Sequence, residues 1–259
     1  ETMLFPDLEY RFKHALTHQV AYGGLLRERR TDLHRAAGSA LEALYTDRLV
    51  EHSEQLAHHF MRAEEWGKAA QYAVLAGQRA DESYANAEAA SQYARALEAM
   101  QRSSPPPDPA DLARVHERHA GALVALTEYE ASIREYQRAL ELVRLAGDRS
   151  REAEVLAALG HAHGRDHRVE AALECTEQSI AVAREWGDRR VEAIGLLERA
   201  ALRAVWYGDI DAATADAEAG LQLVRSGGDA RLHCGAIGRV GMLLQWRGRF
   251  GEALSHFRE

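Results

Sequence analysis

The feature that most constrains the fold is a spacing that recurs through the second half of the chain. Four segments begin with an apolar or aromatic residue, lie 40, 41 and 40 residues apart, and carry a small residue three positions later. The pairs are Tyr129 with Ser132, Val169 with Ala172, Ile210 with Ala213, and Phe250 with Ala253. A fixed period of this size is typical of stacked helix pairs in a solenoid. Because a solenoid presents an extended surface, the pattern favours a binding arm over a catalytic centre.

Glycine and aspartate separate the predicted helix pairs. They occur together as Gly147-Asp148, Gly187-Asp188 and Gly228-Asp229. Glycine can adopt the left-handed conformation that ends a helix, and aspartate can accept hydrogen bonds from the free amides of the next one. The sequence therefore predicts four helix pairs within residues 111–259. Their expected bounds are about 111–147, 148–187, 188–228 and 229–259, the last pair being truncated.

A proline-rich segment precedes these pairs. Four of the five prolines lie within residues 103–110, which we interpret as an extended linker, because proline lacks an amide donor and clashes with the preceding helical turn. We expect a degenerate first helix pair in residues 63–102 and a junction module in residues 1–62. Within that module the pattern predicts a short strand at 9–13 and helices over about 14–22, 27–45 and 50–62.

Composition limits the classes of function. Of the 259 residues, 46% are hydrophobic and 28% are charged, and the formal net charge is -8. An acidic chain repels phosphate backbones, so nucleic acid is not an expected partner. No apolar run approaches the roughly 18 residues that cross a bilayer, and Cys175 and Cys234 indicate no disulfide framework. We expect a reduced, cytoplasmic protein without a membrane partner, and we expect Cys175 to be a small core residue.

The residues that could carry chemistry form no recognisable catalytic set. His14 and His18 lie one helical turn apart, but Ala15 stands where the metalloprotease pattern requires glutamate. His161, His163 and His167 have no cysteine or carboxylate at ligand spacing. No glycine-rich phosphate loop is present. The sequence therefore predicts no catalytic residue, no metal site and no cofactor in this segment, and a metal-dependent enzyme that uses these histidines is kept as an alternative.

The repeats resemble tetratricopeptide repeats. The motif positions are matched by Leu159-Gly160, Val240-Gly241, Gly248-Arg249-Phe250, Ala253 and Phe257. The period exceeds the 34 residues of that family, and Gly-Asp replaces its closing proline. The resemblance implies an all-α fold, a right-handed tetratricopeptide-like helical solenoid, preceded by a short winged-helix-like or helical junction.

The same resemblance places a recognition surface on the concave face, along the first helix of each pair. The residues expected to line it are Arg114, Glu117, Glu154, His161, Glu198, Leu202, Met242 and Gln245. That mixture could bind a basic or amphipathic peptide of a partner protein. A solvated face with no dedicated ligand is the alternative. Trp206 and Trp246 are expected in the core between repeats.

A sharper resemblance lies near the N-terminus. Residues 10–22, followed by Leu25-Leu26 and Arg29-Arg30, resemble the segment that joins the ATPase core of bacterial signal-transducing multidomain ATPases to their C-terminal repeats. The likeness covers about residues 5–100 and is strongest to proteins that begin with a class III adenylate/guanylate cyclase; Gln19 and Gly24 depart from the pattern. It implies a non-catalytic regulatory arm whose partners include its own upstream ATPase core, where ATP and magnesium would bind.

Two other classes of protein remain open. One is the arm of a DNA-binding, ATP-dependent transcription activator, and the other is a stand-alone repeat scaffold. A phosphate-binding loop upstream would separate both ATPase classes from the scaffold. The sequence also stops about ten residues into a helix, by the repeat register. We therefore expect exposed apolar surface near Leu254 and Phe257, and self-association through the truncated last repeat.

Overall fold

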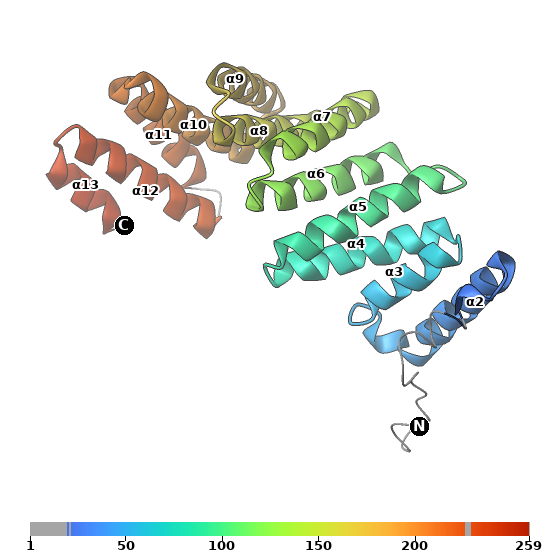
Figure 1. The fold of residues 1–259 in the computed structure, drawn as a ribbon. Helices are drawn as coiled ribbons and strands as arrows, with labels where there is room; N and C mark the ends of the chain where they lie inside the picture. The colour runs from blue at the N-terminus through green and yellow to red at the C-terminus, as the bar shows by residue number, and fades with distance from the viewer. Residues whose placement is uncertain (1–19, 21, 226–228, 259) are drawn as a thin grey trace. The chain divides into compact units, whose positions relative to one another are not determined.

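The computed structural model, drawn in Figure 1, describes residues 20, 22–225 and 229–258. These residues form helices joined by short turns, and no strand occurs among them. The helices are α2 (Arg27–Leu44), α3 (Ser53–Arg62), α4 (Trp66–Glu82), α5 (Asn86–Arg102), α6 (Pro109–Ala125), α7 (Tyr129–Ala146), α8 (Arg149–Arg165), α9 (Val169–Trp186), α10 (Arg189–Leu202), α11 (Ile210–Val224), α12 (Ala230–Trp246) and α13 (Phe250–Phe257). Two short turns of other kinds add η1 (Thr46–Arg48) and η2 (Arg203–Tyr207). The strand expected at residues 9–13 and most of the helix expected at 14–22 lie outside the described residues.

The chain divides into two compact units. The first comprises residues 1–79 and 95–106, and the second comprises residues 80–94 and 107–259. The division passes through α4 and α5, so each unit contains part of both helices. The domain boundaries expected after residues 62, 102 and 110 stay predictions.

Phe60 on α3 is the centre of the first unit. Its side chain is fully buried, and its ring approaches Gly38 of α2 so closely that a Cβ there would lie 3.0 Å away. The ring also stacks on Tyr72 of α4 with centroids 5.6 Å apart. Burying a side chain of this size is strongly favourable, so the absence of a side chain at Gly38 lets α2 and α3 meet at one point.

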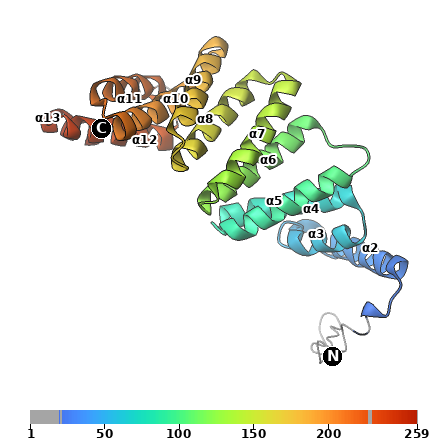
Figure 2. The same cartoon turned by 45° about the horizontal axis from the view of Figure 1, so that its top comes forward.

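Antiparallel helix pairs follow one another in the second unit (Figures 1 and 2). The first helix of each pair begins at an aspartate whose side chain accepts a hydrogen bond from a free backbone amide, as predicted for Asp148, Asp188 and Asp229. Gly147 and Gly187 have the left-handed conformation that the sequence predicts, with φ of 71° and 74°. Gly228 lies outside the described residues. The glycine and aspartate residues between the pairs thus determine where the helices begin and end.

Small residues allow the helices of a pair to pack closely. The small residue of each repeat, Ser132, Ala172, Ala213 or Ala253, is buried. A Cβ on Gly160 of α8 would lie 2.7 Å from Thr176 Oγ1 and 3.2 Å from the Ala172 carbonyl oxygen of α9. Larger side chains at such contacts would separate the helices. The recurring pattern in the sequence is therefore a packing requirement of an all-α solenoid.

The third pair of the second unit contains one more residue than the others. In the second pair, the left-handed turn residue His167 lies 18 positions after Arg149, the first residue of α8. In the third pair, the left-handed turn residue Gly208 lies 19 positions after Arg189, the first residue of α10. After α10 the chain continues through η2, which is a π-helical turn. Because a π-helix closes its hydrogen bonds over five residues instead of four, it accommodates one extra residue. The single spacing of 41 residues in the sequence has this origin.

Candidate functional site

A groove follows the first helices of the pairs in the second unit. Among the described residues, three adjoining hollows of about 500, 340 and 500 Å³ lie along α6, α8, α10 and α12. Glu198 lines all three, Arg190 is shared by the first and second, and His161 by the first and third. Each volume is in the range of ligand sites in proteins, roughly 300 to 1,000 Å³. We call these three hollows together the groove.

Five of the eight residues expected on the recognition surface line the groove. Glu117, Glu154, His161 and Glu198 line the first hollow, and Leu202 lines the third. The remaining three lie outside these hollows. Arg114 is exposed and pairs with Asp111 on its own helix, while Met242 is half-buried and Gln245 is exposed. A role in binding stays a prediction for all eight.

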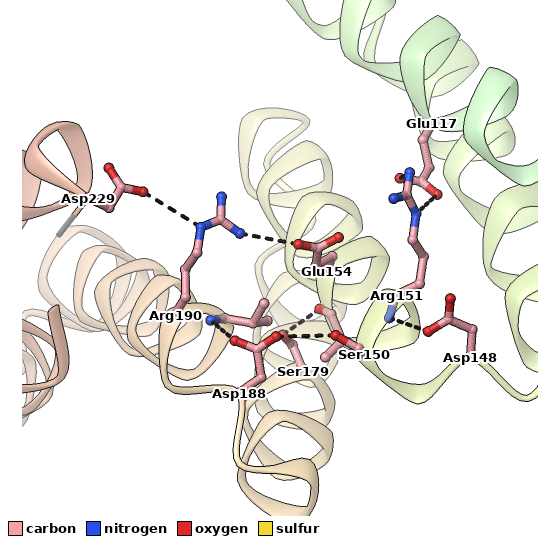
Figure 3. A network of polar contacts seen from close by, with 11 residues as sticks. Glu117, Asp148, Ser150, Arg151, Glu154, Ser179, Asp188, Arg190 and Asp229 are labelled. Carbon is pink, nitrogen blue, oxygen red and sulfur yellow. Dashed lines mark hydrogen bonds and ion pairs between the residues drawn. The ribbon is translucent and has the colours of Figure 1, made fainter. Parts of the chain in front are cut away.

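Ion pairs between successive first helices fix the groove's carboxylates (Figure 3). Arg151 of α8 donates to both carboxylate oxygens of Glu117 of α6, at 2.9 and 3.0 Å. Arg190 of α10 donates to Glu154 of α8 at 3.2 Å and lies 3.6 Å from Asp229, which caps α12. Burial raises the pKa of Glu117, and the Arg151 pair offsets part of that effect. These pairs give the groove a defined shape before any ligand binds.

His161 and Glu198 form the pair at the centre of the groove. The distance from His161 Nδ1 to Glu198 Oε1 is 3.2 Å. The hydrogen bond that His161 donates to Glu198 raises the pKa of His161 despite partial burial. Burial alone would raise the pKa of Glu198, but the hydrogen bond and charge of His161, together with the charge of Arg239, lower it. The carboxylate is therefore ionised near neutral pH and already has a partner.

Sequence reasoning missed the arginines of the groove, which are Arg118, Arg165, Arg190, Arg231 and Arg239. Arg118, Glu198 and Arg239 share one register position in α6, α10 and α12. Aligning the repeats by their aspartate caps would have revealed that column. Among the described residues, Arg231 and Arg239 make no hydrogen bond or ion pair. The groove therefore carries paired anions and two available cations.

The floor of the first hollow is apolar. Ala157, Ala158 and Ile194 contribute to it, together with the phenol of Tyr136. Burial raises the pKa of Tyr136 to about 12, so its hydroxyl keeps its proton and can donate to a ligand at any physiological pH. An apolar floor with polar groups along its edges is the usual character of a binding site.

Two expectations about single residues had different outcomes. Trp206 and Trp246 are 44% and 52% exposed, so their expected place in the core between repeats is wrong. Both precede the turn residue by two positions, where the chain leaves the helix interface. Cys175 is half-buried against the core, and burial raises the pKa of its thiol to about 11, as expected for a packed residue.

Within residues 22–225 and 229–258, no group of three or more His, Cys, Asp or Glu side chains is arranged to hold a metal ion. His14 and His18 lie outside the described residues. None of the described helices combines the length and the apolar character needed to cross a membrane.

Comparison with known proteins identifies the fold. No family model matches the sequence, and no curated protein matches it. BtubC (BKLC) from P. vanneervenii is 17% identical over 90% of this chain and 88% of that chain, with a TM-score of 0.62. A Rap protein complexed with the competence and sporulation factor is 12% identical over 94% and 74%, with a TM-score of 0.64.

A third similar structure comes from a larger protein. PH0952 from Pyrococcus horikoshii, a Signal Transduction ATPase with Numerous Domains (STAND) that has a tetratricopeptide repeat sensor, is 14% identical with a TM-score of 0.64. The match covers 93% of this chain and 38% of that protein. At such identities the likeness shows the fold alone. The chain is an all-α, tetratricopeptide-like helical solenoid.

Proposed function

We propose that this chain is the protein-interaction arm of a larger signalling ATPase, and that its groove binds a segment of a partner protein. The observation that carries the proposal is the charge arrangement of the groove. Glu117, Glu154, Glu198 and Asp229, the groove carboxylates, are each paired within the chain. Arg231 and Arg239 have no such partner among the described residues. A groove with fixed ion pairs and available donors is suited to recognition.

Analogy with two of the similar structures supports this proposal. The Rap structure was solved in complex with the competence and sporulation factor, and the repeats of PH0952 are described as a sensor. The likeness of residues 5–100 to the ATPase junction extends the analogy to proteins with a nucleotide cyclase head. In that arrangement ATP and magnesium would bind in an upstream domain, and the protein would act in the cytoplasm. Partner binding would change the ATPase through two states with different groove contacts.

A groove-filling substitution tests the proposal. Ala158 lies on the groove floor, at the register position where α6 and α12 carry Arg118 and Arg239, so the fold accommodates arginine there. Peptides of about twelve random residues would be selected against the chain by phage display and resynthesised with a fluorescent label. We expect Ala158→Arg to weaken their binding about tenfold or more in fluorescence polarisation, because the new side chain occupies the first hollow.

The matched control is Ala181→Arg. Ala181 is exposed on α9, a second helix outside the groove, so the same change should leave affinity within about twofold. Selected peptides that bind the Ala158→Arg chain as well as the parent would place the binding surface elsewhere and overturn the proposal.

A further inference from the structure

The π-helical turn η2 exposes apolar side chains at one end of the groove. Val205 is 63% exposed and Trp206 is 44% exposed, and Tyr207 beside them is exposed as well. Contiguous exposed apolar side chains on a protein surface often mark an interaction site. Single π turns inside helices are also frequent at functional sites.

Aromatic rings from three turns line the third hollow. Trp206 meets the His167 ring edge to face with centroids 5.3 Å apart, and Val205 also lines the hollow. The Arg165 guanidinium lies over the ring of Tyr129, 5.8 Å from its centroid, and donates to its hydroxyl at 3.2 Å. The hollow measures about 500 Å³. It has room for a large side chain, and its walls offer ring faces and edges for aromatic packing.

The same hollow is positively charged on an otherwise acidic chain. Arg165, Arg239 and His161 line it, and its single carboxylate, Glu198, already pairs with His161. Arg239 keeps its hydrogen-bond donors free among the described residues. The chain as a whole carries a formal charge of -8. A ligand that places a carboxylate here would gain a charge-assisted hydrogen bond without displacing an internal pair.

We infer that the third hollow receives an aromatic side chain of the bound segment, with a neighbouring acidic side chain directed at Arg239. This inference rests on the proposed function and specifies the chemistry of the partner. The bound segment would be acidic and would contain an aromatic residue, whereas the groove carboxylates alone would favour a basic segment. Trp206 contributes most to the affinity, because aromatic residues that become buried on binding dominate the affinity of most interfaces. Arg239 selects for negative charge.

The test uses the peptides selected by display. We expect the enriched sequences to share a Phe, Tyr or Trp within two positions of an Asp or Glu. Trp206→Ala should raise their dissociation constant about tenfold or more, and Arg239→Gln should weaken binding and reduce its dependence on salt. Trp246→Ala is the matched control, because Trp246 is similarly exposed at the same register position outside the groove. It should change affinity by less than about twofold.

A pair of charge variants tests the inference without removing the tryptophan. Val205 is exposed, so both Val205→Asp and Val205→Lys should fold. We expect the aspartate to weaken binding of acidic peptides and the lysine to preserve or strengthen it. Equal effects of the two variants would overturn the inference.

The outcomes separate this inference from the proposed function. Peptides that lose binding with Ala158→Arg but keep it with Trp206→Ala would overturn the inference and leave the proposed function standing. Peptides insensitive to Ala158→Arg would overturn the proposed function, and a selection that enriches nothing would count against both. Loss of self-association on Trp206→Ala, measured by sedimentation, would assign the hollow to a second copy of the chain and overturn the inference.

Discussion

At the scale of single residues, side chains in this chain derive their properties from contacts that a sequence pattern shows only in part. His34 of α2 lies between Tyr22, whose hydroxyl is 2.9 Å from His34 Nε2, and His59 of α3, whose Nδ1 is 3.0 Å from His34 Nδ1. Burial lowers the pKa of His34 to about 4, and the nearby charges of His59, His58 and Arg62 act in the same direction. Burial and these neighbouring charges therefore favour the neutral ring.

Acid should therefore destabilise the first unit. The folded pKa of His34 lies below its ordinary value of 6.5, so its stabilising contribution is complete above that value and is lost as the pH falls toward about 4. Hydrogen exchange of α2 and α3, corrected for intrinsic rates, should show weaker protection at pH 5 than at pH 7. His34→Gln should reduce this difference, while His58 and His59, whose pKa values are also lowered by burial, preserve the rest. An undiminished difference in the variant would refute the assignment.

A second prediction concerns the small residue of the repeat. Ala213 of α11 is fully buried in the core that also contains Ala200, Ala204 and Leu244. Ala213→Leu adds volume where two helices already touch, and we expect it to lower the free energy of unfolding by about 1–3 kcal/mol. Urea unfolding followed by circular dichroism measures the loss. A melting temperature and urea midpoint equal to those of the parent would contradict the contact.

At the scale of elements, the sequence predicts the helix pairs well and the details of one of them poorly. The register of small residues and the aspartate caps depend on local geometry, so they are readable from the chain itself. The place of the extra residue in the third pair cannot be read from the sequence, because a longer loop and a π turn would both give the same spacing of 41 residues. Trp206 and Trp246 were misplaced because both lie two positions before the turn residue, where the chain leaves the helix interface. The groove arginines were missed because their pairing depends on side chains from different repeats.

The π turn should be removable without loss of the fold. Asp216 of α11 accepts hydrogen bonds from Arg199 and Arg203 at 2.7 to 2.9 Å, which ties α10 and η2 to α11. Deleting Val205 restores the residue count of the neighbouring pairs and allows a continuous α-helix, whose hydrogen-bond geometry is better. We expect the urea midpoint to stay the same or rise. Deleting Gln245, which precedes the turn residue Gly248 by three positions as Val205 precedes Gly208, leaves α12 one residue short and should lower the midpoint. Equal losses would show that η2 does not contain the extra residue.

At the scale of the whole molecule, apolar surface outside the groove also offers a place for contact with other molecules. The last described helix, α13, leaves Phe250, Leu254 and Phe257 exposed, as expected near Leu254 and Phe257, although one part of the Phe257 ring also packs over Gly241 of α12. Exposed apolar side chains that gather on one helix favour contact with another molecule. The chain alone should therefore self-associate through α13 as its concentration rises.

Sedimentation velocity over a range of concentrations tests this expectation, with Phe250→Ser/Leu254→Ser as the disrupting variant. The substitutions leave the Phe257 contact with Gly241 in place, so the variant should fold and sediment as a monomer at concentrations where the parent associates. Leu145→Ser, which removes an exposed leucine from α7, should behave like the parent. A parent that remains monomeric at every concentration would refute self-association through α13. A parent that associates, with a variant that does so equally, would move the contact elsewhere. In both of these cases the exposed apolar residues of α13 would be available to a different partner. Repeating the peptide selection on the variant would show whether they bind one.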